Sequence, residues 1–112
     1  MAGKKGMRRK VASRTARQQA WQSMQIFISF TTDDILATAD IKNSNLNKYL
    51  TLLRRHGYVD ETGQIGESGQ LHYRKLFELV KDTGPTCPIA YRESGLRDLN
   101  TGEVFEPEEE EV

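Results

Sequence analysis

One amphipathic segment in the middle of the chain limits the possible folds more than any other feature. Four of its apolar residues have the i, i+3, i+4, i+7 spacing that places side chains on one side of an α-helix. They are Leu46, Tyr49, Leu50 and Leu53. Gly57 follows them, and glycine readily takes the left-handed conformation found just after a helix. The pattern therefore predicts a helix over residues 44–56 that packs one side against a core.

Two further helices are expected before this segment. Helical spacing of apolar residues predicts a first helix over about residues 14–29. Its buried side would hold Ala16, Ala20, Met24 and Phe27, with Trp21 half-buried beside them. Thr31 and Asp34 have the spacing of a capping box, with aspartate in place of the usual glutamate, and predict the start of a short second helix. Asn43 or Ser44 can cap the third helix through a side-chain oxygen.

Two strands are expected after the third helix. Tyr58 and Val59 begin the first strand, and three glycines mark residues 62–70 as a loop. Residues 71–80 form the returning strand, because most of their apolar residues share one parity. A helix over residues 70–79 remains an alternative, since this stretch holds few strong strand-forming residues. Further on, residues 89–91 and 103–105 can pair as a weak hairpin.

Together these elements predict an α+β chain with one domain. Their order is helix, helix, helix, strand, glycine-rich loop, strand. This order corresponds to a three-helix winged helix-turn-helix with a β-hairpin wing and an irregular C-terminal extension. The expected divisions are a disordered basic arm over residues 1–12, the domain over 13–82, the extension over 83–105 and a disordered acidic tail over 106–112.

The net charge of zero conceals a strong asymmetry between the two ends of the chain. Residues 1–20 hold seven basic residues and no acidic ones, whereas residues 103–112 hold six glutamates and no base. Without that acidic end, residues 1–102 carry a formal charge of +6. A basic body with a basic arm is typical of a protein that binds polyanions. Two solvated ends that only keep the chain soluble would give the same charges.

Composition also bears on where the protein works. No apolar run approaches the roughly 20 residues needed to span a bilayer, and the basic N-terminus lacks the apolar core of a signal peptide. The single cysteine, Cys87, allows no internal disulfide, which fits a reducing compartment. We therefore expect a soluble, cytoplasmic protein that does not contact membranes.

The polar side of the third helix is the strongest indication of function. No carboxylate occurs in residues 41–58, whereas an ordinary solvated helix surface mixes both signs of charge. Short polar and basic side chains on such a helix can enter the major groove of duplex DNA. The residues expected to contact base edges are Ser44, Asn47, Lys48 and Thr51.

Other basic residues are expected to contact phosphates rather than bases. Near the third helix these are Lys42, Arg54 and Arg55, and at the base of the wing they are Arg74 and Lys75. In the N-terminal arm they are Arg8, Arg9 and Lys10. The wing contact is expected to be peripheral, because the tip carries Glu67 and the first strand carries Asp60 and Glu61.

Two stretches resemble known families. Residues 39–59, from Ala39-Asp40-Ile41 through Leu53-Arg54-Arg55-His56-Gly57-Tyr58-Val59, resemble the recognition helix and the start of the wing in small winged helix-turn-helix proteins. Residues 79–88, with Asp82-Thr83-Gly84-Pro85, and residues 100–105 are similar to segments of small regulators from Mu-like prophages. The resemblance implies this fold, DNA binding and transcriptional regulation in a phage or mobile element.

The sequence supports no enzyme or metal site. Asp82-Thr83-Gly84 matches the triplet of retroviral-type aspartic proteases, but those chains are almost entirely β, and Pro85 follows the triplet here. The glycines of residues 63–69 lack the lysine and hydroxyl residue of a phosphate-binding loop. His56 and His72 belong to no metal-ligand cluster. We therefore expect no catalysis, no cofactor and no small-molecule substrate.

The sequence also allows partners other than DNA. The same fold could serve as an interaction module that docks a protein of a phage or transposition complex. Its docking surface would then be the charge-poor residues 84–105, with Tyr91 and Phe105 exposed. A homodimer is also open, because DNA-binding proteins of this kind often dimerise to read palindromes.

Overall fold

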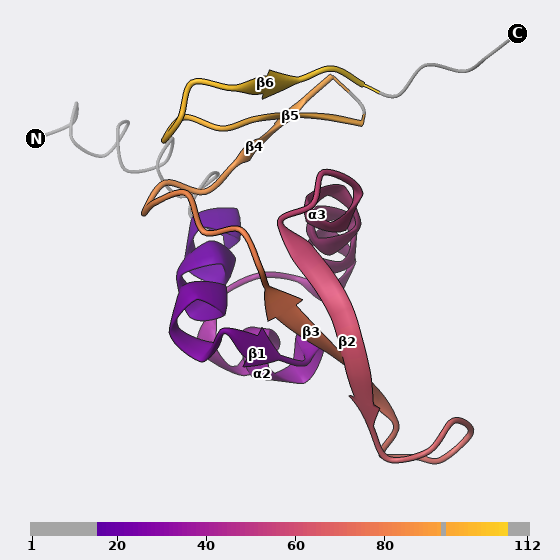
Figure 1. The fold of residues 1–112 in the computed structure, drawn as a ribbon. Coiled ribbons are helices and arrows are strands. Elements are labelled where there is room, and N and C mark those ends of the chain that lie inside the picture. Colours follow the sequence, from indigo (N-terminus) through magenta and orange to yellow (C-terminus); the bar gives the residue numbers. More distant parts are fainter. Residues whose placement is uncertain (1–15, 93, 108–112) are drawn as a thin grey trace, which may run out of the picture.

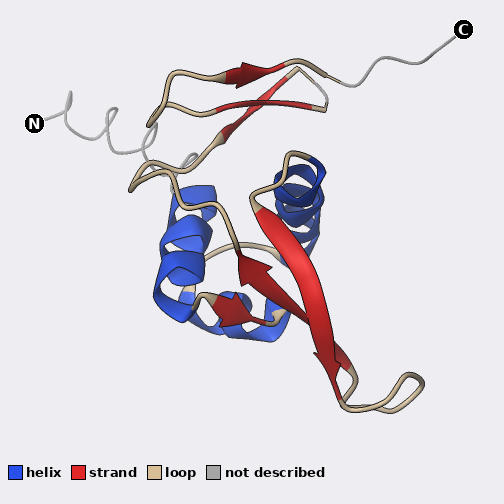
Figure 2. Cartoon of the chain, viewed as in Figure 1, coloured by secondary structure: helices blue, strands red, loops and turns tan. Residues whose placement is uncertain are grey.

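The computed structural model describes residues 16–92 and 94–107 (Figure 1). Within these ranges the chain is α+β, with three helices and two three-stranded antiparallel sheets (Figure 2). No helix in the described part is long and apolar enough to cross a membrane. The expected disorder of the arm over residues 1–12 and of most of the acidic tail concerns residues outside the described ranges.

The helices largely follow the sequence pattern. The first helix covers residues 16–27 of the described chain, followed by α2 (Thr32–Thr38) and α3 (Asn43–Arg55). The predicted capping box is confirmed, since the Asp34 amide donates to Thr31 Oγ1 (3.2 Å) and the Thr31 amide donates to Asp34 Oδ2 (2.9 Å). The predicted side-chain cap of α3 is wrong, because the helix already begins after Lys42, which makes no such cap.

The first helix ends earlier than its apolar spacing predicts. Ile28 adopts a left-handed conformation (φ 65°), which an isoleucine rarely takes and which stops the helix. Its carbonyl accepts a hydrogen bond from the Leu79 amide (2.8 Å) and so joins the sheet instead. As a result Phe27, expected on the buried side, is 38% exposed, whereas Trp21 is fully buried rather than half-buried.

The first sheet has the strand order β1-β3-β2. Its strands are β1 (Ser29–Phe30), β2 (Val59–Ile65) and β3 (Arg74–Leu79). β2 continues through residues expected to be loop, with a register shift between Glu61 and Gly63, and the helical alternative for residues 70–79 is wrong. Figure 1 shows the β2–β3 hairpin and its loop projecting away from the helices.

The expected arrangement of three helices, one hairpin wing and an irregular extension is wrong. Strand β1 pairs with β3 in a three-stranded sheet, and the C-terminal residues form a second sheet in the order β4-β5-β6. Its strands are β4 (Ile89–Tyr91), β5 (Gly95–Arg97) and β6 (Val104–Phe105). The expected direct pairing of residues 89–91 with 103–105 fails because β5 lies between them. Gly95 makes this possible, since a Cβ there would lie 2.6 Å from two backbone oxygens.

Buried and partly buried hydrogen bonds attach the second sheet and the segment leading to it to the helices. The Trp21 indole donates to the Gly84 carbonyl (2.9 Å), and the Tyr49 hydroxyl donates to the Pro88 carbonyl (2.6 Å). His56 Nε2 donates to the Ser94 carbonyl (2.7 Å). A carbonyl can only accept, so Nε2 carries the proton. These bonds hold residues that are far apart in the sequence against one surface of the helical layer.

Asp98 is the centre of this attachment. The carboxylate is fully buried and accepts hydrogen bonds from the hydroxyls of Tyr58 (2.6 Å) and Thr83 (2.7 Å) at Oδ2. The amides of Asn100 and Thr101 donate to Oδ1. Burial alone would raise the pKa of the Asp98 carboxyl, but these four hydrogen bonds outweigh it, so the pKa lies below its ordinary value. The Asp82-Thr83-Gly84 triplet thus has a structural role here, since the Thr83 hydroxyl donates a hydrogen bond to the Asp98 carboxylate.

Candidate nucleic-acid interface

Helix α3 separates into the two sides that the sequence predicts. Its apolar side is buried, with Leu46, Tyr49, Leu50 and Leu53 in the core and Leu52 beside them. Its other side is exposed along the whole helix. The exposed residues are Ser44, Asn47, Lys48, Thr51, Arg54 and Arg55, with Lys42 just before the helix. The structure therefore leaves the polar and basic side chains of α3 accessible to a large ligand.

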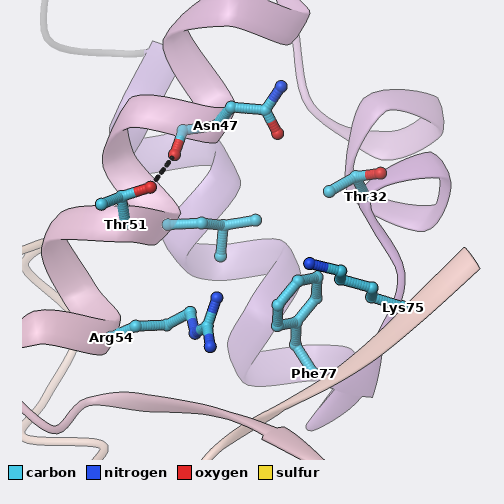
Figure 3. Close-up of a pocket in the computed structure, with 7 residues that line it drawn as sticks. Thr32, Asn47, Thr51, Arg54, Lys75 and Phe77 are labelled. Carbon is cyan, nitrogen blue, oxygen red and sulfur yellow. Dashed lines mark hydrogen bonds between the residues drawn. The ribbon is translucent and has the colours of Figure 1, made fainter. Parts of the chain in front are cut away.

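A hollow of about 360 Å³ lies on one flank of this exposed side (Figure 3). Asn47, Thr51 and Arg54 line it from α3. Thr32 at the start of α2 and Lys75 on β3 close it from the opposite side. Two predicted base-contacting residues and two predicted phosphate-contacting residues therefore border a common space.

The side chains of Asn47 and Thr51 differ in whether they already make a hydrogen bond. The Thr51 hydroxyl donates to the Asn47 carbonyl one turn earlier (2.9 Å), so its proton is used within the helix. Among the described residues, the Asn47 side-chain amide makes no hydrogen bond and presents both a donor and an acceptor (Figure 3). An amide with both groups available matches the major-groove edge of adenine.

The carboxylate of Glu61 on β2 compensates the positive charges of the two cations that line this hollow, Arg54 and Lys75. Its carboxylate lies 3.3 Å from Arg54 and 4.0 Å from Lys75. Arg54 also lies over the Phe77 ring, 5.6 Å from the centroid. Although α3 itself has no acidic residue, folding brings Glu61 and the neighbouring Asp60 of β2 to its flank, where both line a hollow with Arg54 and Arg55.

Arg74, the other cation predicted at the base of the hairpin, is engaged elsewhere. It forms an ion pair with Asp33 in the first turn of α2 (2.5 Å) and donates to the Tyr73 carbonyl (2.6 Å). These contacts hold the side chain against its own chain. Arg8, Arg9 and Lys10, predicted to contact phosphates, lie outside the described residues.

A second hollow, of about 310 Å³, lies on the opposite flank of α3. Lys48, Thr51 and Arg55 line it from α3, and Arg17 lines it from the first helix. Ala90 on β4 and Ser94 just before β5 close it. Sequence reasoning missed Arg17 as a site residue, because only the tertiary structure brings it beside α3. Its one signal in the sequence is its place in the acid-free basic stretch of residues 1–20.

Removing the Glu61 carboxylate tests how much this charge lowers the affinity for an anionic ligand. Glu61→Gln is expected to increase the affinity for duplex DNA about fivefold, because Arg54 and Lys75 lose their compensating charge and repulsion of the phosphates disappears. Fluorescence anisotropy with a labelled random duplex measures this change. The matched control is Glu67→Gln in the hairpin loop, away from the hollow. An equal gain in both variants would show that only net charge matters.

Comparison with known proteins leaves the family open. No family model, curated protein or solved structure matches the chain. The resemblance to prophage regulators therefore stays a prediction from the sequence. What bears on function is the geometry around α3.

Proposed function

We propose that this protein binds duplex DNA through the exposed side of α3. The observation that supports this most is the exposed, acid-free surface of α3, with a hollow on each flank. An α-helix is about 10–12 Å wide with its side chains, and the major groove of B-form DNA is about 12 Å wide. The helix can therefore enter the groove while residues beside it reach the two phosphate backbones.

The side chains on this surface suit distinct parts of the duplex. Asn47, with its open amide, is suited to adenine, and the exposed Lys48 can donate to guanine. Lys42 and Arg55 lie at the two ends of the helix, where the phosphate backbones pass. In this proposal the polar middle of α3 reads bases and the cations around it position the helix. Regulation of transcription in a phage or mobile element is the setting that the sequence resemblance favours.

Docking of a protein at residues 84–105 has less support. Phe105, expected to be exposed, is half-buried. Its ring packs 5.4 Å from His56 and 6.1 Å from Tyr58, and the Lys81 ammonium lies 4.9 Å from its centroid. The aromatic side chain that would anchor such a partner is thus used within the chain.

A titration tests DNA binding directly. Isotope-labelled protein is titrated with a random duplex at about 50 and 200 mM salt, and amide shifts are followed by NMR. We expect shifts concentrated at residues 42–55 and an affinity that falls steeply as salt rises. An unchanged spectrum at low salt would contradict the proposal.

Substitutions then separate base contacts from phosphate contacts. After a preferred site is selected from a random DNA pool, Asn47→Ala and Lys48→Ala are expected to weaken that site by about 1–3 kcal/mol more than random DNA. Arg55→Ala is expected to weaken both about equally, because a phosphate contact carries no sequence information. Affinities from anisotropy on both duplexes give the comparison. If Asn47→Ala and Lys48→Ala also weakened both duplexes equally, base reading by α3 would be excluded.

A further inference from the structure

An apolar surface forms where the first helix ends and β1 begins. Ile26 is 80% exposed, Phe27 is 38% exposed and Ile28 is 44% exposed. Val80, which is 49% exposed, lies close to them, because the amide of its neighbour Leu79 donates to the Ile28 carbonyl (2.8 Å). Single exposed apolar side chains are ordinary on a protein surface, whereas a contiguous group of them marks a surface that another molecule covers.

The edge of the first sheet beside this surface carries unpaired backbone groups. β1 is an edge strand, since the sheet order is β1-β3-β2 (Figure 1). In antiparallel strands, pairs of residues that exchange hydrogen bonds alternate with pairs that do not. The bond from Leu79 to Ile28 places Ser29, opposite Glu78, in a pair of the second kind. The amide and carbonyl of the exposed Ser29 therefore point away from β3, and within residues 16–92 and 94–107 neither has a hydrogen-bond partner.

Charge does not protect this edge against pairing with another chain. No charged residue occurs in residues 18–32, although 29% of the chain is charged. The opposite edge strand, β2, carries Asp60 and Glu61, and charged side chains discourage pairing at an open edge. Of the two edges of this sheet, β1 is therefore the one suited to receive a further strand.

We propose that two copies of this chain associate through β1 and the apolar surface beside it. A two-fold axis at Ser29 places its amide and carbonyl against the same groups of the partner, so antiparallel pairing satisfies both. An uncharged surface meets its own copy without like charges facing each other, whereas a charged partner gains no ion pair there. The two three-stranded sheets then form one continuous sheet. This surface does not include the exposed side of α3, so the dimer leaves two copies of that helix accessible.

The contact is small, so we expect a weak association. A standard interface buries about 800 Å² and roughly 20–30 residues on each partner, more than one short strand and a few apolar side chains supply. Sedimentation velocity of the full-length protein from about 1 to 300 µM should show the mean mass rising from one chain towards two, as for a micromolar dissociation constant. Salt of about 0.3 M screens attraction between the basic and acidic ends of different chains. The mass of a single chain at every concentration would overturn the proposal.

Ile26→Lys tests whether the apolar surface forms the contact. We expect the dissociation constant to rise about a hundredfold, because each copy loses a buried apolar side chain and two-fold symmetry counts the loss twice. The matched control is Leu71→Lys in the β2–β3 loop, where the leucine is 86% exposed, and it should leave association unchanged. Equal weakening by both variants would contradict the assignment to this surface. Lysine is favourable near the end of a helix, and if circular dichroism nevertheless shows unfolding, Ile26→Gln and Leu71→Gln replace the pair.

A cysteine at position 29 tests the pairing of the strands. Directly opposite residues that exchange hydrogen bonds have Cα atoms about 5.5 Å apart, a separation that a disulfide spans. Under mild oxidation, Ser29→Cys is expected to form a disulfide-linked dimer on a non-reducing gel, whereas Ser68→Cys in the exposed hairpin loop should stay mostly monomeric. The native Cys87 is buried and common to both variants. Equal cross-linking of the two would overturn the pairing through β1. Neither measurement involves DNA, so failure of the dimer leaves the proposed function to its own tests.

Discussion

Replacing Asp98 with alanine is expected to lower the free energy of unfolding by about 4 kcal/mol. The substitution removes the acceptor of the hydroxyl groups of Tyr58, which is buried, and Thr83, which is half-buried. Each buried donor left without a partner costs about 1–3 kcal/mol, and the amides of Asn100 and Thr101 lose their acceptor as well. Urea unfolding followed by circular dichroism measures the change.

The matched control for this substitution is Asp82→Ala. Asp82 also accepts hydrogen bonds, from Gln25 (2.8 Å) and from the Gly84 amide (3.1 Å), but it lies on the surface, where water can replace the carboxylate. We expect a loss of about 1 kcal/mol or less. Equal destabilisation by the two substitutions would show that burial of the Asp98 network contributes little.

The pH dependence of unfolding gives an independent check on Asp98. Because the pKa of its carboxyl is lower in the folded state, the folded protein favours the ionised form. This contribution to stability is complete above the ordinary aspartate pKa of about 3.9. It is lost as the pH falls from there through the lower folded-state pKa. Asp98→Asn should therefore show a smaller decline of stability below about pH 4 than the wild type does.

Reversing the charge of Lys48 is expected to have the largest effect on DNA binding. Lys48 is exposed in the middle of α3, and it lines the second hollow together with Arg17 and Arg55. Lys48→Glu exchanges an attractive charge for a repulsive one, which at about 6 Å and an effective dielectric constant of about 40, between those of a protein surface and of water, changes the energy by roughly 3 kcal/mol. We expect about a hundredfold loss of affinity at low salt, measured by anisotropy.

Salt and a second charge reversal control this experiment. The difference between wild type and Lys48→Glu should shrink as salt rises, because screening weakens both attraction and repulsion. Arg97→Glu makes the same change of charge on the exposed surface of β5 and should lose only a small part of the affinity. If both variants lost affinity equally, a diffuse effect of net charge would account for the result without a contact at α3.

Local patterns predicted the helical elements well. The i, i+3, i+4, i+7 spacing placed Leu46, Tyr49, Leu50 and Leu53 on the buried side of α3, as the structure confirms. The Thr31–Asp34 spacing identified the start of α2. Such signals are local, because a helix makes its hydrogen bonds within four residues and its caps within three. The exposed residues of α3 followed from the same periodicity.

The strands and the surroundings of α3 were predicted poorly. β1 has two residues and β5 has three, too few to show an alternating pattern, and each depends on partners distant in the sequence. The arrangement expected from the order of elements was wrong for this reason. Glu61 and Arg17 were likewise not identifiable as neighbours of α3, since their positions depend on β2 and on the packing of the first helix.

By itself, the sequence determined which side of each helix is apolar, where α2 begins and that α3 carries no acidic residue, because these properties depend on neighbours one or two turns away. Only the tertiary structure decided which charges meet at α3. It brought Glu61 to one flank, and it placed Arg17 of the first helix beside Lys48 and Arg55 on the other. It also placed the Asp98 carboxylate where it accepts hydrogen bonds from Tyr58 and Thr83, which lie 40 and 15 positions away in the chain. Contacts at such separations arise from chain packing, which local periodicity does not encode.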